Sequence, residues 1–190
     1  MVKVDISSAI GHLNSTRSSV EVLDLPRESG VYAVYLSERG SLRPFANLGE
    51  ILYVGKSESS LQVRDLQTHF TTGKSGRSTL RRTLGAILKD ELSLKCIPRK
   101  DRNPTCKDFE CYRFRDDGEE RLTLWMHTNL EVGYVLAAPY GIPVKLLEDL
   151  IKGVLKPPLN LDPAYRKANP FAATLMAMRK ACVEEARTAT

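Results

Sequence analysis

Residues 50–70 read EILYVGKSESSLQVRDLQTHF and join a short strand to a helix through a glycine. The β-branched and aromatic residues 51–54 predict a strand that ends at Gly55. A cationic turn with Lys56 follows, and residues 61–70 have the apolar spacing of a helix. The glycine lets another group approach closely, and a helix start offers unpaired N–H donors to an anion. Since a cation lies beside this turn, we expect the anion to be a phosphate.

A second strand is predicted just before this stretch. Gly30–Leu36 is rich in β-branched and aromatic residues, which favours extended structure. If it pairs with residues 51–55 as an antiparallel hairpin, the start of one strand lies beside the end of the other. The pairing therefore places Tyr32 and Tyr53 near the same end of a sheet, close to Lys56.

A basic loop of small residues occupies positions 71–78, after the predicted helix. Its Gly-Lys-Ser at 73–75 is similar to part of a nucleotide-binding P-loop, but that motif needs glycine where this chain has Thr68. The P-loop interpretation is therefore rejected. Ser78 at the end of the loop is expected to cap the next helix.

The positive charge is concentrated in one part of the chain. The net charge is +5, and residues 56–115 hold fourteen Lys and Arg against seven Asp and Glu. Arg81 and Arg82 lie off the apolar stripe of the predicted helix, so they either face solvent or contact phosphate. The candidate nucleic-acid contacts are Lys56, Lys74, Arg77, Arg81 and Arg82.

An acidic residue near the end of the chain has an unusual position on its helix. Residues 143–155 predict a helix, and Glu148 lies at the border of its apolar stripe. Asp149 instead shares a face with Lys145 and Lys152, where pairing in solvent explains it. With no adjacent cation expected, the carboxylate of Glu148 is the one that favours a metal or a proton.

Length and composition indicate one compact domain. The chain has 190 residues, 42 % of them hydrophobic, and no apolar run approaches the roughly 20 residues needed to span a bilayer. We therefore expect a cytoplasmic protein without membrane contacts, while the oligomeric state stays open. The four cysteines contain no CxxC pair, which favours reduced thiols over a zinc site.

With these motifs in place, the chain resembles the GIY-YIG nuclease superfamily. Gly30-Val31-Tyr32 stands for the first signature and Tyr53-Val54-Gly55 for the second. The further matching residues, in order, are Lys56, Arg64, His69, Glu148 and Asn160. The resemblance implies an α+β fold: a small, mainly antiparallel three-stranded sheet flanked by helices. Its core would span about residues 26–70 and 131–162, with an insertion at 71–130 and a C-terminal helix at 169–187.

The resemblance also implies an activity, which is metal-dependent hydrolysis of DNA phosphodiesters. Glu148 would hold Mg²⁺ or Mn²⁺, a hard cation that prefers oxygen ligands. Arg64 would clamp the phosphate oxygens, and Asn160 would be a structural or substrate-orienting hydrogen-bonding residue. The general base would be Tyr32, Tyr53 or His69. A tyrosine with an ordinary pKa of about 10 is a poor base at pH 7 unless Lys56 or the metal lowers that pKa. His69 needs no such shift. The preferred assignment is Tyr32 with His69 assisting.

Two features depart from the family pattern. The gap between Tyr32 and Tyr53 is longer than usual, which implies an elongated loop. Arg64 and His69 are five residues apart instead of four, which turns them about 140° apart on a regular helix. A π-bulge would restore a common face and is the favoured interpretation; otherwise His69 is not catalytic and Thr68 faces the site.

Two other kinds of function stay open. A catalytically inactive nucleic-acid-binding module could keep the same fold, although the complete residue set argues against it. A structural or protein-interaction domain that uses the basic insertion is the third alternative. Nicking of DNA and the salt dependence of binding distinguish the three.

Overall fold

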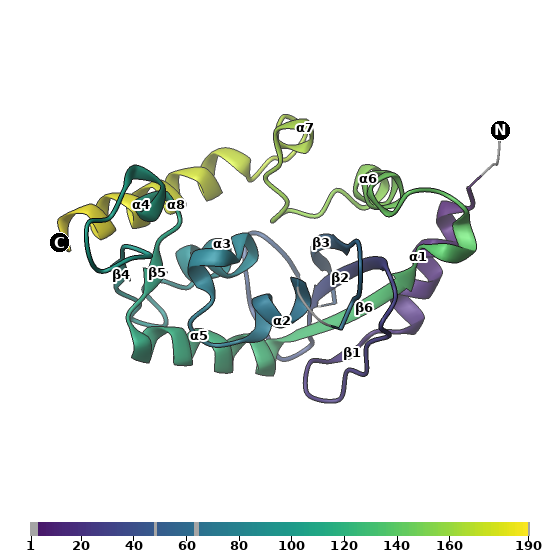
Figure 1. Ribbon diagram of the computed structural model, residues 1–190, viewed down its shortest axis with the longest axis horizontal. Helices are drawn as coiled ribbons and strands as arrows, with labels where there is room; N and C mark the ends of the chain where they lie inside the picture. Colours follow the sequence, from purple (N-terminus) through teal and green to yellow (C-terminus); the bar gives the residue numbers. More distant parts are fainter. Residues whose placement is uncertain (1–3, 48, 63–64, 190) are drawn as a thin grey trace. The chain divides into compact units, whose positions relative to one another are not determined.

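The computed structural model describes residues 4–47, 49–62 and 65–189, and for residues 65–67 it describes the backbone alone (Figure 1). The chain folds into two compact units. The first comprises Met1–Gln67 and His127–Pro170, and the second comprises Thr68–Met126 and Phe171–Thr190.

An antiparallel sheet of four strands forms the first unit. The strands are β1 (Ser18–Ser19), β6 (Leu130–Leu136), β2 (Gly30–Leu36) and β3 (Ile51–Ser57), in that spatial order. The predicted antiparallel pairing of β2 with β3 is confirmed, and so is the α+β class with a small antiparallel sheet. The sequence did not reveal β1 because two consecutive serines carry no apolar alternation.

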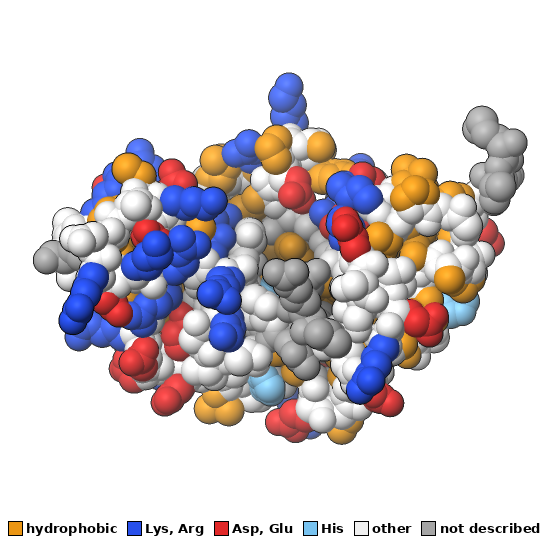
Figure 2. Space-filling view, in the orientation of Figure 1, with side chains coloured by type: hydrophobic (Ala, Val, Ile, Leu, Met, Phe, Trp, Pro, Cys, Tyr) orange, Lys and Arg blue, Asp and Glu red, His pale blue; other side chains and the backbone are white. Residues whose placement is uncertain are grey.

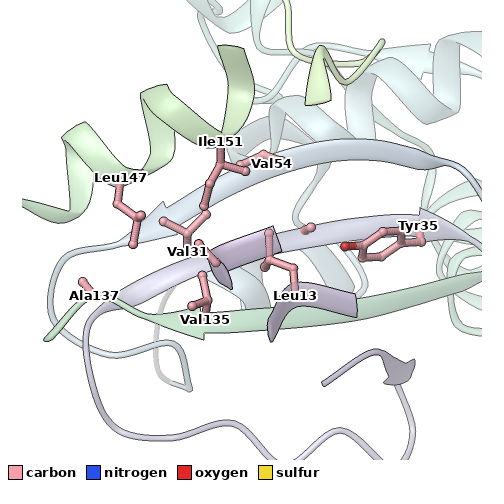
Figure 3. Close-up of a cluster of buried hydrophobic side chains, with 10 residues drawn as sticks. Leu13, Val31, Tyr35, Val54, Val135, Ala137, Leu147 and Ile151 are labelled. Atoms are coloured by element: carbon pink, nitrogen blue, oxygen red, sulfur yellow. The ribbon is translucent and has the colours of Figure 1, made fainter. Parts of the chain in front are cut away.

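Helices α1 (Ile6–Ser15) and α6 (Val144–Leu155) bury one face of this sheet. Figure 3 shows Leu147 and Ile151 pointing from α6 onto Val31 and Val54. Alternation along the strands puts Tyr32 and Tyr53 on the opposite face. The sheet therefore separates Tyr32 and Tyr53 from the apolar core that holds α6 in place.

The insertion and the C-terminal helix together form the second unit. Its elements are η1 (Ser75–Arg77), α3 (Thr79–Ile87), β4 (Cys96–Ile97), α4 (Cys106–Glu110), β5 (Arg113–Phe114) and α8 (Ala172–Thr188). Helix α5 (Asp116–Asn129) begins in this unit and leads into β6. Within the unit α8 packs against α3, α4 and β4, so segments separated by more than 60 residues of sequence share one core (Figure 1). Strands β4 and β5 form an antiparallel pair within the insertion.

Several boundaries differ from the predictions. Helix α2 (Asp65–Phe70) begins later than the predicted residue 61, and Asp117-Gly118, a residue pair typical of turns, lies inside α5. The aspartates of this first turn favour a helix start, which outweighs the turn tendency of Asp-Gly. The short elements η2 (Ala138–Tyr140) and α7 (Pro163–Arg166) were not predicted. Of the helices that the structure describes, none has the length and apolar character to cross a membrane.

Candidate active site

Tyr32 and Tyr53 are neighbours on the face of the sheet opposite to α1 and α6. Tyr32 pairs with Gly55 and Val34 pairs with Tyr53 in the β2–β3 register. The two ring centroids are 6.3 Å apart and the ring planes are tilted by 37°. The predicted proximity of the two phenols is therefore confirmed.

Gly55 has no side chain because the ring of Tyr32 occupies that space. A β carbon at Gly55 would lie 2.3 Å from the Tyr32 hydroxyl oxygen and 2.4 Å from its ring carbon Cζ. The ring thus extends from β2 over β3, and its hydroxyl lies above the strand that forms the outer edge of the sheet. Tyr32 is only 2 % exposed, so this position is fixed by packing.

Asn160 is bound to that same outer edge. Its Oδ1 accepts a hydrogen bond from the Val54 N–H at 2.8 Å, and its Nδ2 donates to the Val54 carbonyl at 2.9 Å. The Leu159 N–H also donates to the Leu52 carbonyl. Asn160 thus pairs with β3 as another strand would. Of the two roles the sequence leaves open for Asn160, these contacts favour the structural one.

Glu148 is buried but, contrary to the expectation, it has an adjacent cation. Its carboxylate is 6 % exposed, and Oε1 lies 2.7 Å from Nζ of Lys152, one turn further along α6. Lys152 is itself buried, bonds Asp162 at 3.1 Å and lies over the ring of Tyr165. From the sequence, Lys152 is expected to pair with Asp149 in solvent. Its i,i+4 spacing to Glu148 is the signal that indicates the ion pair observed here.

A small pocket connects this ion pair with Asn160. Lys152, Lys156, Asn160 and Tyr165 are among the residues that line it, and its volume is about 110 Å³. Lys152, which pairs with Glu148, and Asn160, which binds the outer edge of β3, therefore line the same pocket.

His69 belongs to the second unit and is 7 % exposed there. Its Nδ1 lies 2.6 Å from the hydroxyl of Ser78, which caps α3. Burial, aided by the positive charge of Arg81, lowers the pKa of His69 to about 4, so the ring is neutral at pH 7. Helix α2 is α-helical over its described residues, while the turn around residue 64 lies outside them. The π-bulge therefore stays a prediction.

Arg81 and Arg82 are not on the surface, which corrects the sequence interpretation of both. Arg81 is completely buried and bonds the carboxylate of Glu119 at 2.7 Å, the hydroxyl of Ser75 and the carbonyl of His69. Arg82 is 7 % exposed and donates to the Ser75 carbonyl at 2.9 Å. A helical-wheel argument could not foresee this because the buried acid that compensates Arg81 comes from a distant helix.

The comparisons with known proteins give the family. A family model for the GIY-YIG catalytic domain matches residues 30–181, which is most of the chain. The chain belongs to the GIY-YIG family. No curated protein and no solved structure matches it. The matched span includes the insertion and extends beyond Asn160 into α8, further than the quoted motifs reach.

The remaining GIY-YIG positions are Lys56 and Arg64. Lys56 is half-buried at the end of β3 and forms an ion pair with the exposed Glu58. Arg64 lies outside the residues that the structure describes. Its predicted phosphate-clamping role stays a prediction.

The GIY-YIG family implies a divalent metal, and the donor chemistry here fits one. Glu148 supplies hard carboxylate oxygens; Oε1 is bound by Lys152, while Oε2 lies 3.8 Å from Lys145 Nζ, too far for a hydrogen bond. The described residues contain no group of three His, Cys, Asp or Glu side chains that could hold a metal. One carboxylate is nevertheless sufficient for Mg²⁺, which keeps several waters and binds substrate phosphate.

Proposed function

We propose that this protein is a metal-dependent endonuclease that hydrolyses DNA phosphodiesters at the outer edge of β3. Membership of a nuclease family makes nucleic acid the substrate class. The observation that carries the proposal is the Tyr32 ring lying across Gly55, because it brings a phenol hydroxyl to a sheet edge. Asn160 binds this strand, and Lys152, the partner of the buried Glu148, lines the same pocket as Asn160.

Several residues of the chain would have distinct roles in this reaction. Tyr32, as a phenolate whose formation Lys56 or the metal would favour, would orient the attacking water and accept its proton, with Tyr53 beside it. Asn160 would keep β3 straight and in place through its two bonds to Val54. Lys152 would fix the orientation of the Glu148 carboxylate. His69 is bonded to Ser78, and we therefore assign the proton-accepting role to Tyr32 alone.

Glu148 would hold the metal, which is Mg²⁺ or Mn²⁺. When bound, the ion polarises the scissile phosphate and stabilises the leaving 3′-oxygen. Arg64 would add charge-assisted hydrogen bonds to the non-bridging phosphate oxygens.

The test is nicking of supercoiled plasmid DNA with Mg²⁺ or Mn²⁺. The wild-type protein is expected to convert plasmid to nicked or linear forms, and Glu148→Gln to lose at least a hundredfold in rate. Lys167→Gln, an exposed substitution outside the site, is the control and should retain the wild-type rate. No metal-dependent nicking, or equal rates for wild type and Glu148→Gln, would contradict the proposal.

One observation favours a second candidate, a catalytically inactive nucleic-acid-binding module. The ammonium group of Lys152 already neutralises the charge of Glu148. Such a pair is expected in a protein that no longer binds a metal at this position. This candidate predicts salt-dependent DNA binding without nicking at any metal concentration.

A further inference from the structure

The whole net positive charge of the chain resides in the second unit. Counted over Thr68–Met126 and Phe171–Thr190, this unit has sixteen Lys and Arg against eleven Asp and Glu. The first unit has twelve of each. Figure 2 shows Lys and Arg side chains gathered over α3, α4 and the β4–β5 pair. Electrostatic attraction for a polyanion therefore belongs to the insertion and not to the sheet unit.

A groove of about 640 Å³ lies within this basic unit. We call it the basic groove. Its cationic lining residues are Lys74, Arg77, Arg99, Lys100 and Arg113.

Only part of this charge is neutralised locally. Arg113 pairs with the lining aspartates Asp101, at 2.7 Å, and Asp116, at 3.3 Å. Arg99 pairs with the buried Asp108 at 2.7 Å. Among the described residues, the other three lining cations form no ion pair within 4 Å. With the three paired aspartates set against the five lining cations, the basic groove keeps a net charge of about +2 for an anionic partner.

Buried residues hold the groove wall in shape. The Ser75 hydroxyl donates to Glu119 at 2.9 Å and accepts from Arg81 Nε at 3.1 Å. The Ser75 carbonyl accepts from Arg82 at 2.9 Å. Ser75 lies between Lys74 and Arg77, so the two buried arginines fix the loop that presents both cations.

A glycine brings a third cation against this loop. A β carbon at Gly76 would lie 2.8 Å from Cγ of Arg99, so the Arg99 side chain lies across the loop backbone. Two hydrogen bonds to Asp108 fix its guanidinium. Because these contacts already order the loop and Arg99, binding an anion requires little further loss of conformational freedom.

We propose that the basic groove binds the phosphate backbone of double-stranded DNA and supplies most of the protein's DNA affinity. This inference rests on the proposed function and names the surface that holds the substrate. No aromatic residue is among the described residues that line the groove, so bases of a single strand would find no stacking surface. Phosphate contacts of this kind are independent of sequence.

The experiment measures binding of a labelled 20-base-pair duplex by fluorescence anisotropy, in EDTA and over a range of salt concentrations. The double variant Arg77→Glu/Lys100→Glu is compared with Lys167→Glu/Lys180→Glu, which changes the net charge equally at exposed positions outside the groove. The groove variant should bind at least tenfold more weakly, and its slope of log affinity against log salt should fall by about 2. The control should stay within threefold of wild type.

Duplex affinity of the groove variant within threefold of wild type would overturn the inference. So would equal losses in both double variants, or tighter binding of a single strand than of the duplex. If the charge-reversed protein does not fold, Arg77→Ala/Lys100→Ala replaces it with the same expected direction.

DNA binding in EDTA requires neither a metal ion nor hydrolysis of the DNA. The binding assay therefore tests the groove, and the nicking assay tests the nuclease activity. A wild-type protein that binds through the groove but never nicks DNA contradicts the nuclease activity alone. A protein that nicks DNA but binds it independently of the groove contradicts the groove alone.

Discussion

At the scale of single residues, the site depends on the missing side chain of Gly55 and on Asn160, which takes the place of a neighbouring strand beside β3. Gly55 leaves room for the Tyr32 ring, and Asn160 satisfies both backbone groups of Val54 on an edge strand. Unsatisfied, those buried groups would each cost about 1–3 kcal/mol. Both residues therefore support the position of Tyr32.

Gly55→Ala should displace the Tyr32 hydroxyl. Its β carbon would overlap the ring, so we expect a loss of about 1–3 kcal/mol in the free energy of unfolding and at least tenfold slower nicking. Chemical denaturation and the plasmid assay measure these effects. Gly11→Ala, in open space on α1, is the control and should raise stability by about 0.5–1 kcal/mol. Unchanged nicking by Gly55→Ala would contradict the role of the ring.

The sequence could predict part of this site but not all of it. The strand pattern was sufficient to place Tyr32 beside Tyr53, because antiparallel register follows from pairing. It left the partner of Glu148 open, since Lys152 lies about one helical turn from both Glu148 and Asp149. Which of two nearby acids a lysine meets depends on the three-dimensional packing around α6.

At the scale of elements, the polar side of α3 is buried and forms an ion pair inside the protein instead of facing solvent. Arg81 on α3 and Glu119 on α5 form an ion pair with almost no exposure. Breaking a buried pair by removing one partner is strongly destabilising, because the other charge is left uncompensated.

Arg81→Met should therefore lower the free energy of unfolding by about 3–5 kcal/mol. Arg187→Met removes an exposed arginine paired with Glu184 on α8 and should change it by less than about 0.5 kcal/mol. Urea denaturation followed by circular dichroism measures both. Similar small effects in the two variants would show that the buried pair does not stabilise α3.

His69 should make stability depend on pH. Its pKa is about 4 in the folded protein and about 6.5 when unfolded, so the unfolded chain binds more protons between these values. The stability it contributes is complete above pH 6.5 and is lost as the pH falls to about 4, by up to about 3 kcal/mol. His69→Gln removes this dependence. Unfolding free energies from pH 4 to 7 should therefore diverge between the two proteins, and parallel curves would contradict the assignment.

At the scale of the whole molecule, the chain consists of a neutral sheet unit and a basic unit. The sheet was predictable because its strands and helices carry local periodic patterns. The second unit was not, because its core joins α8 to the insertion across a large sequence distance, which no local pattern records. The prediction of a single domain, with an insertion at 71–130 and a C-terminal helix at 169–187, stays a prediction.

The proposed metal site is tested most directly by the position of Mn²⁺ in crystals soaked with the ion, located by anomalous diffraction. We expect a peak about 2.1 Å from a carboxylate oxygen of Glu148, on the side of α6 that faces the Asn160 pocket. A saturated crystal with no peak at Glu148, in which the Glu148–Lys152 ion pair is intact, would contradict it.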